Sequence, residues 1–255
     1  MVAIQKALKV LNEDGAKGLL GRGAAHIYQK IRPLIPGGYP ARLGGIVTCY
    51  DHKWIDRLVP STWLPWRLVY ELESYEAALL SGLNQHVREG DRIVIVGAGI
   101  GVTAVCAALR TGGSGRVECF EGSLEQCKQV KKTAKRNNIS NLNLNHAVVA
   151  SVIDVHGDLS GVGVIIPAAR LPPCDVLELD CEGSEVQILR EMIITPRVLL
   201  VETHGINNAP TSLVKSLMED RGYLVSDLGW AEPALKDACE RDDVRVLLGV
   251  RNGDH

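Results

Sequence analysis

The feature that most constrains this chain is a short apolar run that leads directly into a glycine-rich turn. Residues 92–96 (Arg-Ile-Val-Ile-Val) are mostly apolar and β-branched, which is typical of a strand buried on both faces of a parallel sheet. Residues 97–101 (Gly-Ala-Gly-Ile-Gly) follow at once, and small residues continue into a predicted helix at 101–111. Such glycines allow a tight turn and a close ligand approach, while the helix N-terminus offers free N–H groups. The run therefore predicts a nucleotide-type cofactor site in a Rossmann-like domain.

Alternating strand and helix patterns extend from residue 68 to the end of the chain. Strands are predicted at 92–96, 116–120, 142–149, 175–179, 197–202, 223–228 and 244–250. Helices are predicted at 70–87, 101–111, 124–138, 185–193 and 211–221. Strands separated by helices of this length form βαβ units, and the short connection before the final strand favours antiparallel pairing there. We expect an α/β fold: a Rossmann-like, doubly wound, mostly parallel seven-stranded sheet with an antiparallel last strand.

The first 67 residues do not follow this pattern and are predicted to form an N-terminal extension. It contains a predicted helix at 23–35, β-like residues at 45–50 and a turn rich in tryptophan. Residues 1–42 carry seven Lys and Arg against two acidic residues, which indicates a solvated helical face or, as the alternative, a contact with an anionic membrane or an acidic partner. The extension is a candidate for capping the site, binding substrate or making a homodimer. Residues 68–255 are predicted to form the cofactor-binding domain.

Composition narrows the class of partner and the compartment. A net charge of −2 argues against a general nucleic-acid binder, which usually carries a basic surplus. No segment has the apolar length of a signal peptide or of a membrane-spanning helix. The seven cysteines include no C-x-x-C pair and their number is odd, so neither a disulfide framework nor a zinc site is indicated. We expect a soluble, cytoplasmic protein in a reducing environment.

An acid after the second strand narrows the identity of the cofactor. Glu121 lies 24 residues after Gly97 and can accept hydrogen bonds from both ribose hydroxyls of an adenosine group. Its alternative role, at the N-terminus of the next helix, is less favoured because Ser123 supplies a cap there. Val102 stands where a dinucleotide site favours glycine, and the chain has no G-x-x-x-x-G-K-[ST] sequence. The pattern therefore favours S-adenosylmethionine, which has no pyrophosphate.

A longer motif follows at the fourth predicted strand. Residues 173–185 read Pro-Cys-Asp-Val-Leu-Glu-Leu-Asp-Cys-Glu-Gly-Ser-Glu. This D-x-x-x-x-D-x-E-G-x-E run, after such a glycine turn, resembles the FkbM family of class I S-adenosylmethionine-dependent methyltransferases. Residues 70–73 with 87–91, and residues 198–204, resemble the family's lead-in to the first strand and its fifth strand. The resemblance covers roughly residues 68–250. It implies metal-independent O-methylation of a sugar-type or other small hydroxyl acceptor, free or on a glycan.

The glycine turn departs from the family's pattern at its centre, where Gly99 replaces the frequent asparagine, and in the strand before it. The family's strand usually carries an acid before the turn, whereas residues 94–96 are apolar here. That leaves the amino group of the cofactor without a carboxylate on this strand, and Glu71 on the preceding predicted helix is a candidate substitute. The cofactor contacts predicted in total are Glu71, Gly97, Ala98, Gly99, Gly101, Glu121, Gly122, Ala147 and Asp180.

Three groups near the predicted strand ends are candidates for the catalytic base. In open parallel sheets, ligands bind outside the carboxyl ends of the strands, where Asp180, Glu182 and His204 are expected. Asp180 and His204 are favoured, because the unperturbed pKa of histidine, ~6.5, suits proton transfer near neutrality. Glu182 and Glu185 can instead stabilise the N-terminus of the next helix, and for Glu185 that structural role is the stronger interpretation.

The remaining clusters are given structural interpretations. Asp154-x-His156-x-Asp158 has ligand residue types but lies in a glycine-rich loop, so no metal is predicted. Cys181 is taken as apolar filler rather than a nucleophile. A basic run is taken as a solvated helical face: Lys128, Lys131, Lys132, Lys135 and Arg136.

Two other functions compete with methyl transfer. One is a nicotinamide-dependent oxidoreductase. Val102 and the D-x-x-x-x-D-x-E-G-x-E run at residues 175–185, called the acidic motif below, both argue against it. The other is a catalytically inactive Rossmann-like binding module that serves a complex through its basic N-terminal arm. The missing acid before the glycine turn leaves this second alternative open.

Overall fold

The computed structural model describes residues 40–49, 70–149 and 164–251. The helix predicted at 23–35, the tryptophan-rich turn and the loop at 154–158 lie outside these ranges. β1 (Pro40–Leu43), β2 (Ile46–Cys49) and β3 (Tyr70–Leu72) form a small sheet in the order β2-β1-β3. β1 runs antiparallel to β2 and parallel to β3. The predicted β-like residues near 45–50 are therefore a strand.

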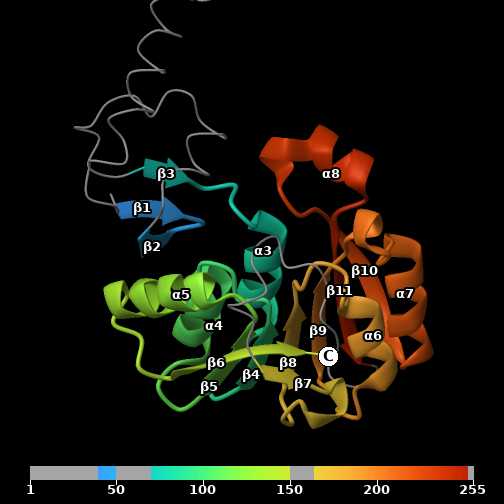
Figure 1. Cartoon of the computed structure of the whole chain (residues 1–255), viewed down its shortest axis with the longest axis horizontal. Coiled ribbons are helices and arrows are strands. Elements are labelled where there is room, and N and C mark those ends of the chain that lie inside the picture. The colour runs from blue at the N-terminus through green and yellow to red at the C-terminus, as the bar shows by residue number, and fades with distance from the viewer. Residues whose placement is uncertain (1–39, 50–69, 150–163, 252–255) are drawn as a thin grey trace, which may run out of the picture. The chain divides into compact units, whose positions relative to one another are not determined.

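The main sheet contains eight strands in the described part of the chain, in the order β10-β11-β9-β8-β4-β5-β6-β7 (Figure 1). Their bounds are β4 Arg92–Val96, β5 Arg116–Glu121, β6 Leu142–Val149, β7 Val164–Ile166, β8 Val176–Leu179, β9 Val198–Glu202, β10 Tyr223–Trp230 and β11 Arg245–Arg251. β11 pairs antiparallel with both β9 and β10, and the other pairs are parallel. This is the predicted Rossmann-like fold, with β7 as an additional edge strand.

Helices connect these strands in two groups. Their bounds are α3 Ala77–His86, α4 Val102–Thr111, α5 Leu124–Arg136, α6 Glu185–Glu191, α7 Thr211–Asp220 and α8 Lys236–Asp242. From β4 through β5 to β6 the chain moves toward one edge of the sheet, and from β8 to β9 it moves toward the opposite edge. Because connections between parallel strands are right-handed, α4 and α5 lie on one face of the sheet and α6 lies on the other. The basic residues of α5 named above are exposed, as predicted. Among the described helices, none has the length and apolar character needed to cross a membrane.

The prediction of a helix at 70–87 is wrong for residues 70–76. Helix α3 begins only at Ala77, while residues 70–72 form β3 and pair in parallel register with Ala41 to Leu43 of β1. The partner strand comes from the predicted N-terminal extension, so this pairing could not be found in the local pattern. Tertiary strand pairing overrides helix propensity over this short segment.

The interior of the main sheet is almost entirely aliphatic. Ile93, Ile95, Leu177 and Leu200 are fully or almost fully buried, and Phe120 is the single phenylalanine. Burial on both faces is what the apolar run at 92–96 predicts. The core therefore leaves the strand ends as the place for polar chemistry.

One buried ion pair ties the start of the sheet together. Arg197, just before β9, donates to Asp91, just before β4, with an Nη2–Oδ2 distance of 2.7 Å. Both side chains are nearly buried, with 13% and 11% of their areas exposed. Arg197 also donates to the carbonyl oxygen of His86, and Asp91 accepts from the backbone N–H of Arg88. The pair joins the end of α3 to the starts of β4 and β9, which lie on either side of β8.

Replacing Asp91 with alanine is expected to lower the free energy of unfolding by about 3 kcal/mol, because it leaves the Arg197 charge buried without a partner. Urea unfolding followed by circular dichroism measures this change. The matched control is Lys215→Ala, which removes an exposed pair with Glu219 at 3.9 Å and should cost less than about 0.5 kcal/mol. Equal losses in the two variants would contradict the structural role of the Asp91 pair.

Candidate active site at the carboxyl ends of the strands

The glycine turn brings the ends of β4 and β8 into backbone contact. Gly97 has a φ of 87°, and a Cβ atom there would overlap the carbonyl oxygen of Asp180. Asp180 in turn donates its N–H to the Val96 carbonyl at 2.9 Å. Only glycine combines this backbone conformation with such close approach. The glycine turn and the acidic motif therefore meet where Gly97 contacts Asp180.

The other two glycines of the turn have different surroundings. A Cβ on Gly101 would lie 3.0 Å from the Cα of Val130, so this position lets α5 approach the start of α4. A Cβ on Gly99 would have no atom within 4 Å among the described residues. Gly99 thus faces open space, as a turn that admits a ligand requires.

Glu121 is bonded to the same turn. It is the last residue of β5, and its Oε2 accepts a hydrogen bond from Gly99 N at 3.0 Å while its Oε1 accepts from Ser123 N at 2.8 Å. Burial raises the pKa of Glu121, and these N–H donors oppose that rise. Ser123 caps α5 through the N–H of Gln126, as predicted. Glu121 therefore lies beside the open side of the glycine turn.

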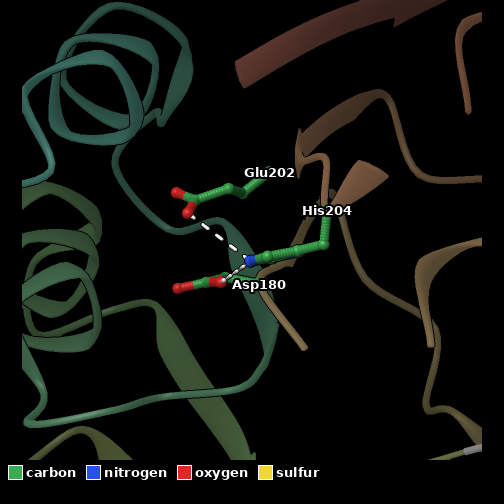
Figure 2. A group of neighbouring side chains, drawn as sticks. All are labelled: Asp180, Glu202 and His204. Carbon is green, nitrogen blue, oxygen red and sulfur yellow. Dashed lines mark ion pairs between the residues drawn. The ribbon is translucent and has the colours of Figure 1, made fainter. Parts of the chain in front are cut away.

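His204 lies among four carboxylates. Its Nδ1 is 2.9 Å from Oε1 of Glu185. Its Nε2 lies 3.6 Å from Asp180 Oδ1, 3.7 Å from Glu202 Oε1 and 3.8 Å from Glu182 Oε2. Figure 2 shows Asp180 and Glu202 turned toward the Nε2 side of the ring. The sheet thus brings the end of β9 and His204 next to the segment between β8 and α6, about 20 residues earlier in the sequence.

These charges shift the pKa values of the group. Burial alone would lower the pKa of His204, but the hydrogen bond to Glu185 and the charges of Asp180, Glu185 and Glu182 raise it to about 9. Burial raises the pKa of Asp180 to about 7 although the His204 charge opposes this. The expectation that His204 titrates near 6.5 is therefore wrong for the protein without a ligand. The pKa of Asp180, in contrast, lies near neutrality.

The acidic motif holds its side chains through an unusual backbone. Glu182 has a φ of 53° and Gly183 a φ of 107°, and a Cβ on Gly183 would overlap the carbonyl oxygen of Asn207. Glu182 is mostly exposed and accepts a hydrogen bond from Asn207 Nδ2 at 3.2 Å. Glu185 is buried at the start of α6 and accepts from Cys181 N at 2.9 Å. Glu185 thus has the predicted structural role and in addition orients His204.

The structure corrects the secondary structure predicted around Glu71. Glu71 lies on β3 rather than on a helix, and its exposed carboxylate pairs with Arg42 at 3.5 Å. A second acid of this region is Glu76, which directly precedes α3 with a φ of 46°. Burial raises its pKa well above the usual value, and the charge of Asp180 raises it further. Its backbone N–H donates to Glu232 Oε1 at 2.9 Å.

Glu76, Glu178 and Glu232 are the acidic residues that the sequence analysis missed. Glu178 on β8 is fully buried, and burial raises its pKa to about 8. Of the three, only Glu76 could have been suspected from the sequence, because it lies in the segment that leads to β4. The other two required knowledge of which strands are neighbours.

The remaining predicted residues have mainly structural surroundings. Ala147 is buried and pairs with Val164 of β7, which continues the sheet past the end of β5. A Cβ on Gly122 would crowd Val148, and the Gly122 carbonyl lies 3.0 Å from Nε2 of His146. Burial raises the pKa of the Cys181 thiol far above its usual value, in accord with its interpretation as filler. Ala98 is buried within the glycine turn.

Comparison with known proteins reveals a general likeness of fold. No protein-family model and no curated protein matches the chain. A precorrin-6y C5,15-methyltransferase from Geobacter metallireducens is 14% identical, and the match, with a TM-score of 0.46, covers 69% of this chain and 87% of that protein. Fibrillarin from Aeropyrum pernix, solved with natively bound S-adenosylmethionine, is 18% identical, with 68% and 73% covered and a TM-score of 0.43. A methyltransferase from Aquifex aeolicus is 13% identical, with 79% and 98% covered and a TM-score of 0.45.

Gly97→Ala is expected to destabilise the fold by more than about 3 kcal/mol, because the new Cβ meets backbone at a positive φ. Gly99→Ala also has a positive φ but meets no atom, so its cost should be about 1 kcal/mol. Chemical unfolding of both variants measures the difference. If Gly97→Ala is as stable as Gly99→Ala, the contact between the two motifs is not as described.

Glu232→Gln is expected to change how stability depends on pH. Burial raises the pKa of Glu232 to about 7, above the ~4.3 of an unfolded chain. Its contribution to stability is therefore present below about pH 4 and is lost as the pH rises through 7. Glutamine avoids this loss, so the variant should gain about 1–2 kcal/mol over the native protein between pH 5 and pH 8, allowing for solvent screening near Glu76 and Glu202. Unfolding free energies at both pH values measure the gain, and the exposed Glu240→Gln serves as the control that should show none.

Proposed function

We propose that this chain is an S-adenosylmethionine-dependent methyltransferase that methylates a hydroxyl group of a small-molecule or glycan acceptor. The observation that carries the proposal is the contact between Glu121 and the Gly99 N–H at the carboxyl end of the parallel sheet. A carboxylate at the tip of the second strand, next to an open glycine turn, is suited to the ribose of an adenosine cofactor. The resemblance of residues 173–185 to the FkbM motif supports the same cofactor.

The groups around the turn fit the parts of this cofactor. Gly99 leaves room on the open side of the turn, and Glu121 is positioned to accept the ribose hydroxyls. The positively charged amino group requires a carboxylate, and Glu76 replaces Glu71 as our candidate for it, because Glu76 is buried and the charge of Asp180 contributes to its raised pKa. Opposite charges within a few ångströms favour such a contact.

The acceptor would lie beside Asp180. S-adenosylmethionine, when bound, supplies an electrophilic methyl group. Asp180 touches the glycine turn through its backbone and carries a carboxylate on the same strand end, so it is the group that we assign to accept the hydroxyl proton. Its pKa of about 7 suits that role. Glu185 holds the His204 ring, which orients the acceptor, and Glu182 lies at the exposed rim.

Calorimetric titration of the full chain with S-adenosylmethionine and S-adenosylhomocysteine tests the cofactor. We expect saturable binding to both, and a loss of roughly 30- to 100-fold in affinity for Glu121→Ala, because two hydrogen bonds to a charged group are lost. Glu219→Gln on the exposed side of α7 is the control and should bind normally.

Absence of binding at high micromolar ligand would overturn the proposal. Normal cofactor binding by Glu121→Ala would contradict the assigned ribose contact. A change in nicotinamide fluorescence on adding protein would point to an oxidoreductase instead. If the chain bound no nucleotide cofactor but still bound a partner protein, an inactive Rossmann-like binding module would be favoured.

A further inference from the structure

A second ligand-binding arrangement lies at the ends of β8 and β9. Asp180 follows β8, Glu202 ends β9 and His204 comes two residues later. One side-chain ligand atom from each residue lies within 4.8 Å of the other two. In Figure 2 the two carboxylates and the imidazole converge on a common space. Two oxygens and one nitrogen therefore face each other across a small gap.

The spacing of these atoms is unsuitable for direct hydrogen bonds. The Nε2 of His204 lies 3.6 Å from Asp180 and 3.7 Å from Glu202, whereas N–H···O bonds are about 2.7–3.2 Å long. Two ligands that each lie about 2.1 Å from a shared ion are roughly 3.4 Å apart at a tetrahedral angle and slightly more at a wider one. The observed separations match ligands of one ion better than they match direct bonds.

The environment of His204 is an independent indication. The ring is about 95% buried, yet its Nε2 makes no hydrogen bond within the described part of the chain and points into the gap. The opposite nitrogen, Nδ1, is held by Glu185 at 2.9 Å. A carboxylate that accepts the Nδ1 proton leaves Nε2 as the nitrogen that can bind an ion once the ion displaces its proton, which is the usual outer-sphere arrangement of a metal-binding histidine. The arrangement of Glu185 and His204 thus exposes a ligand atom toward the two carboxylates.

The local charge also favours a cation. Four carboxylates, from Asp180, Glu182, Glu185 and Glu202, lie within 3.8 Å of one imidazole ring. A histidine supplies at most one positive charge, so the group is negative overall. Buried charges are normally paired or coordinate metals. A divalent ion in the gap would offset the excess.

We infer that Asp180, Glu202 and His204 bind one divalent transition-metal ion, with Glu185 as the positioning residue for His204. The imidazole nitrogen suits a first-row transition-metal ion, whereas Mg²⁺ and Ca²⁺ prefer oxygen alone; the two carboxylates also suit Mn²⁺, whose unpaired electrons can report a nitrogen ligand. Mn²⁺ is therefore the probe. The inference departs from the metal-independent reaction expected from the sequence, and it does not require the proposed methyl transfer. A bound ion would lower the pKa of Asp180, so the proton transfer assigned to Asp180 above belongs to the ion-free site.

Electron paramagnetic resonance of the full chain with Mn²⁺ tests this inference without any variant. After treatment with EDTA and dialysis, one Mn²⁺ per chain should bind, and electron spin echo modulation should show coupling to a ¹⁴N nucleus of an imidazole. Binding should occur without S-adenosylmethionine, so failure of the proposed function would leave this result unchanged. The absence of saturable binding up to about 1 mM, the range of weak protein sites, would overturn the inference. Binding without nitrogen coupling would overturn it as well.

Variants separate the ligands from the rest of the acidic group. His204→Gln should abolish the nitrogen coupling, and Glu202→Gln should weaken Mn²⁺ binding even if His204→Gln fails to fold. Glu185→Gln should weaken binding roughly 10- to 100-fold while the nitrogen coupling persists, as expected for a residue that acts through another. Glu219→Gln, on the exposed side of α7, is the matched control and should bind Mn²⁺ within a few-fold of the native chain. Unchanged affinity in Glu202→Gln would contradict the ligand assignment.

Discussion

The contact between Gly97 and the carbonyl of Asp180 is the constraint on which the candidate site depends. It closes the distance between β4 and β8, the two central strands, so that the glycine turn and the acidic motif share one edge. A larger residue at position 97 would separate the two motifs because backbone cannot move aside as a flexible side chain can. Every group assigned to the site is placed relative to this contact.

The acidic group at this edge is tolerated because the core below it is largely apolar, with Glu178 as a buried exception. Leu177 and Leu179 on β8, and Leu199 to Val201 on β9, are buried and need no polar partners. The free energy of folding comes chiefly from such burial, so the strand ends can carry like charges at a cost. That cost is visible in the raised pKa values of Asp180 and Glu202. Raised carboxyl pKa values at one edge are a common property of functional sites.

Local patterns predicted the strands and helices well where each element is long and buried. β4 and β6 have the predicted bounds, and α4, α5 and α7 differ by two residues or fewer at each end. Errors arose where a distant segment decides the local structure. Residues 70–72 form a strand because β1 pairs with them, and that moved the expected cofactor contact from Glu71 to Glu76. The short β7 also depends on pairing with β6.

The sequence by itself determined the α/β fold, the glycine turn with Glu121 after the next strand, and the acidic motif with His204 among the candidate residues, since these follow from periodicity and from short motifs. Only the tertiary structure decided what these residues do to one another. Glu185 holds His204, and Asp180 and Glu202 face its other nitrogen across strands that lie apart in the sequence. Burial and neighbouring charge set the pKa of each group, and both depend on which strand ends are neighbours in the folded chain.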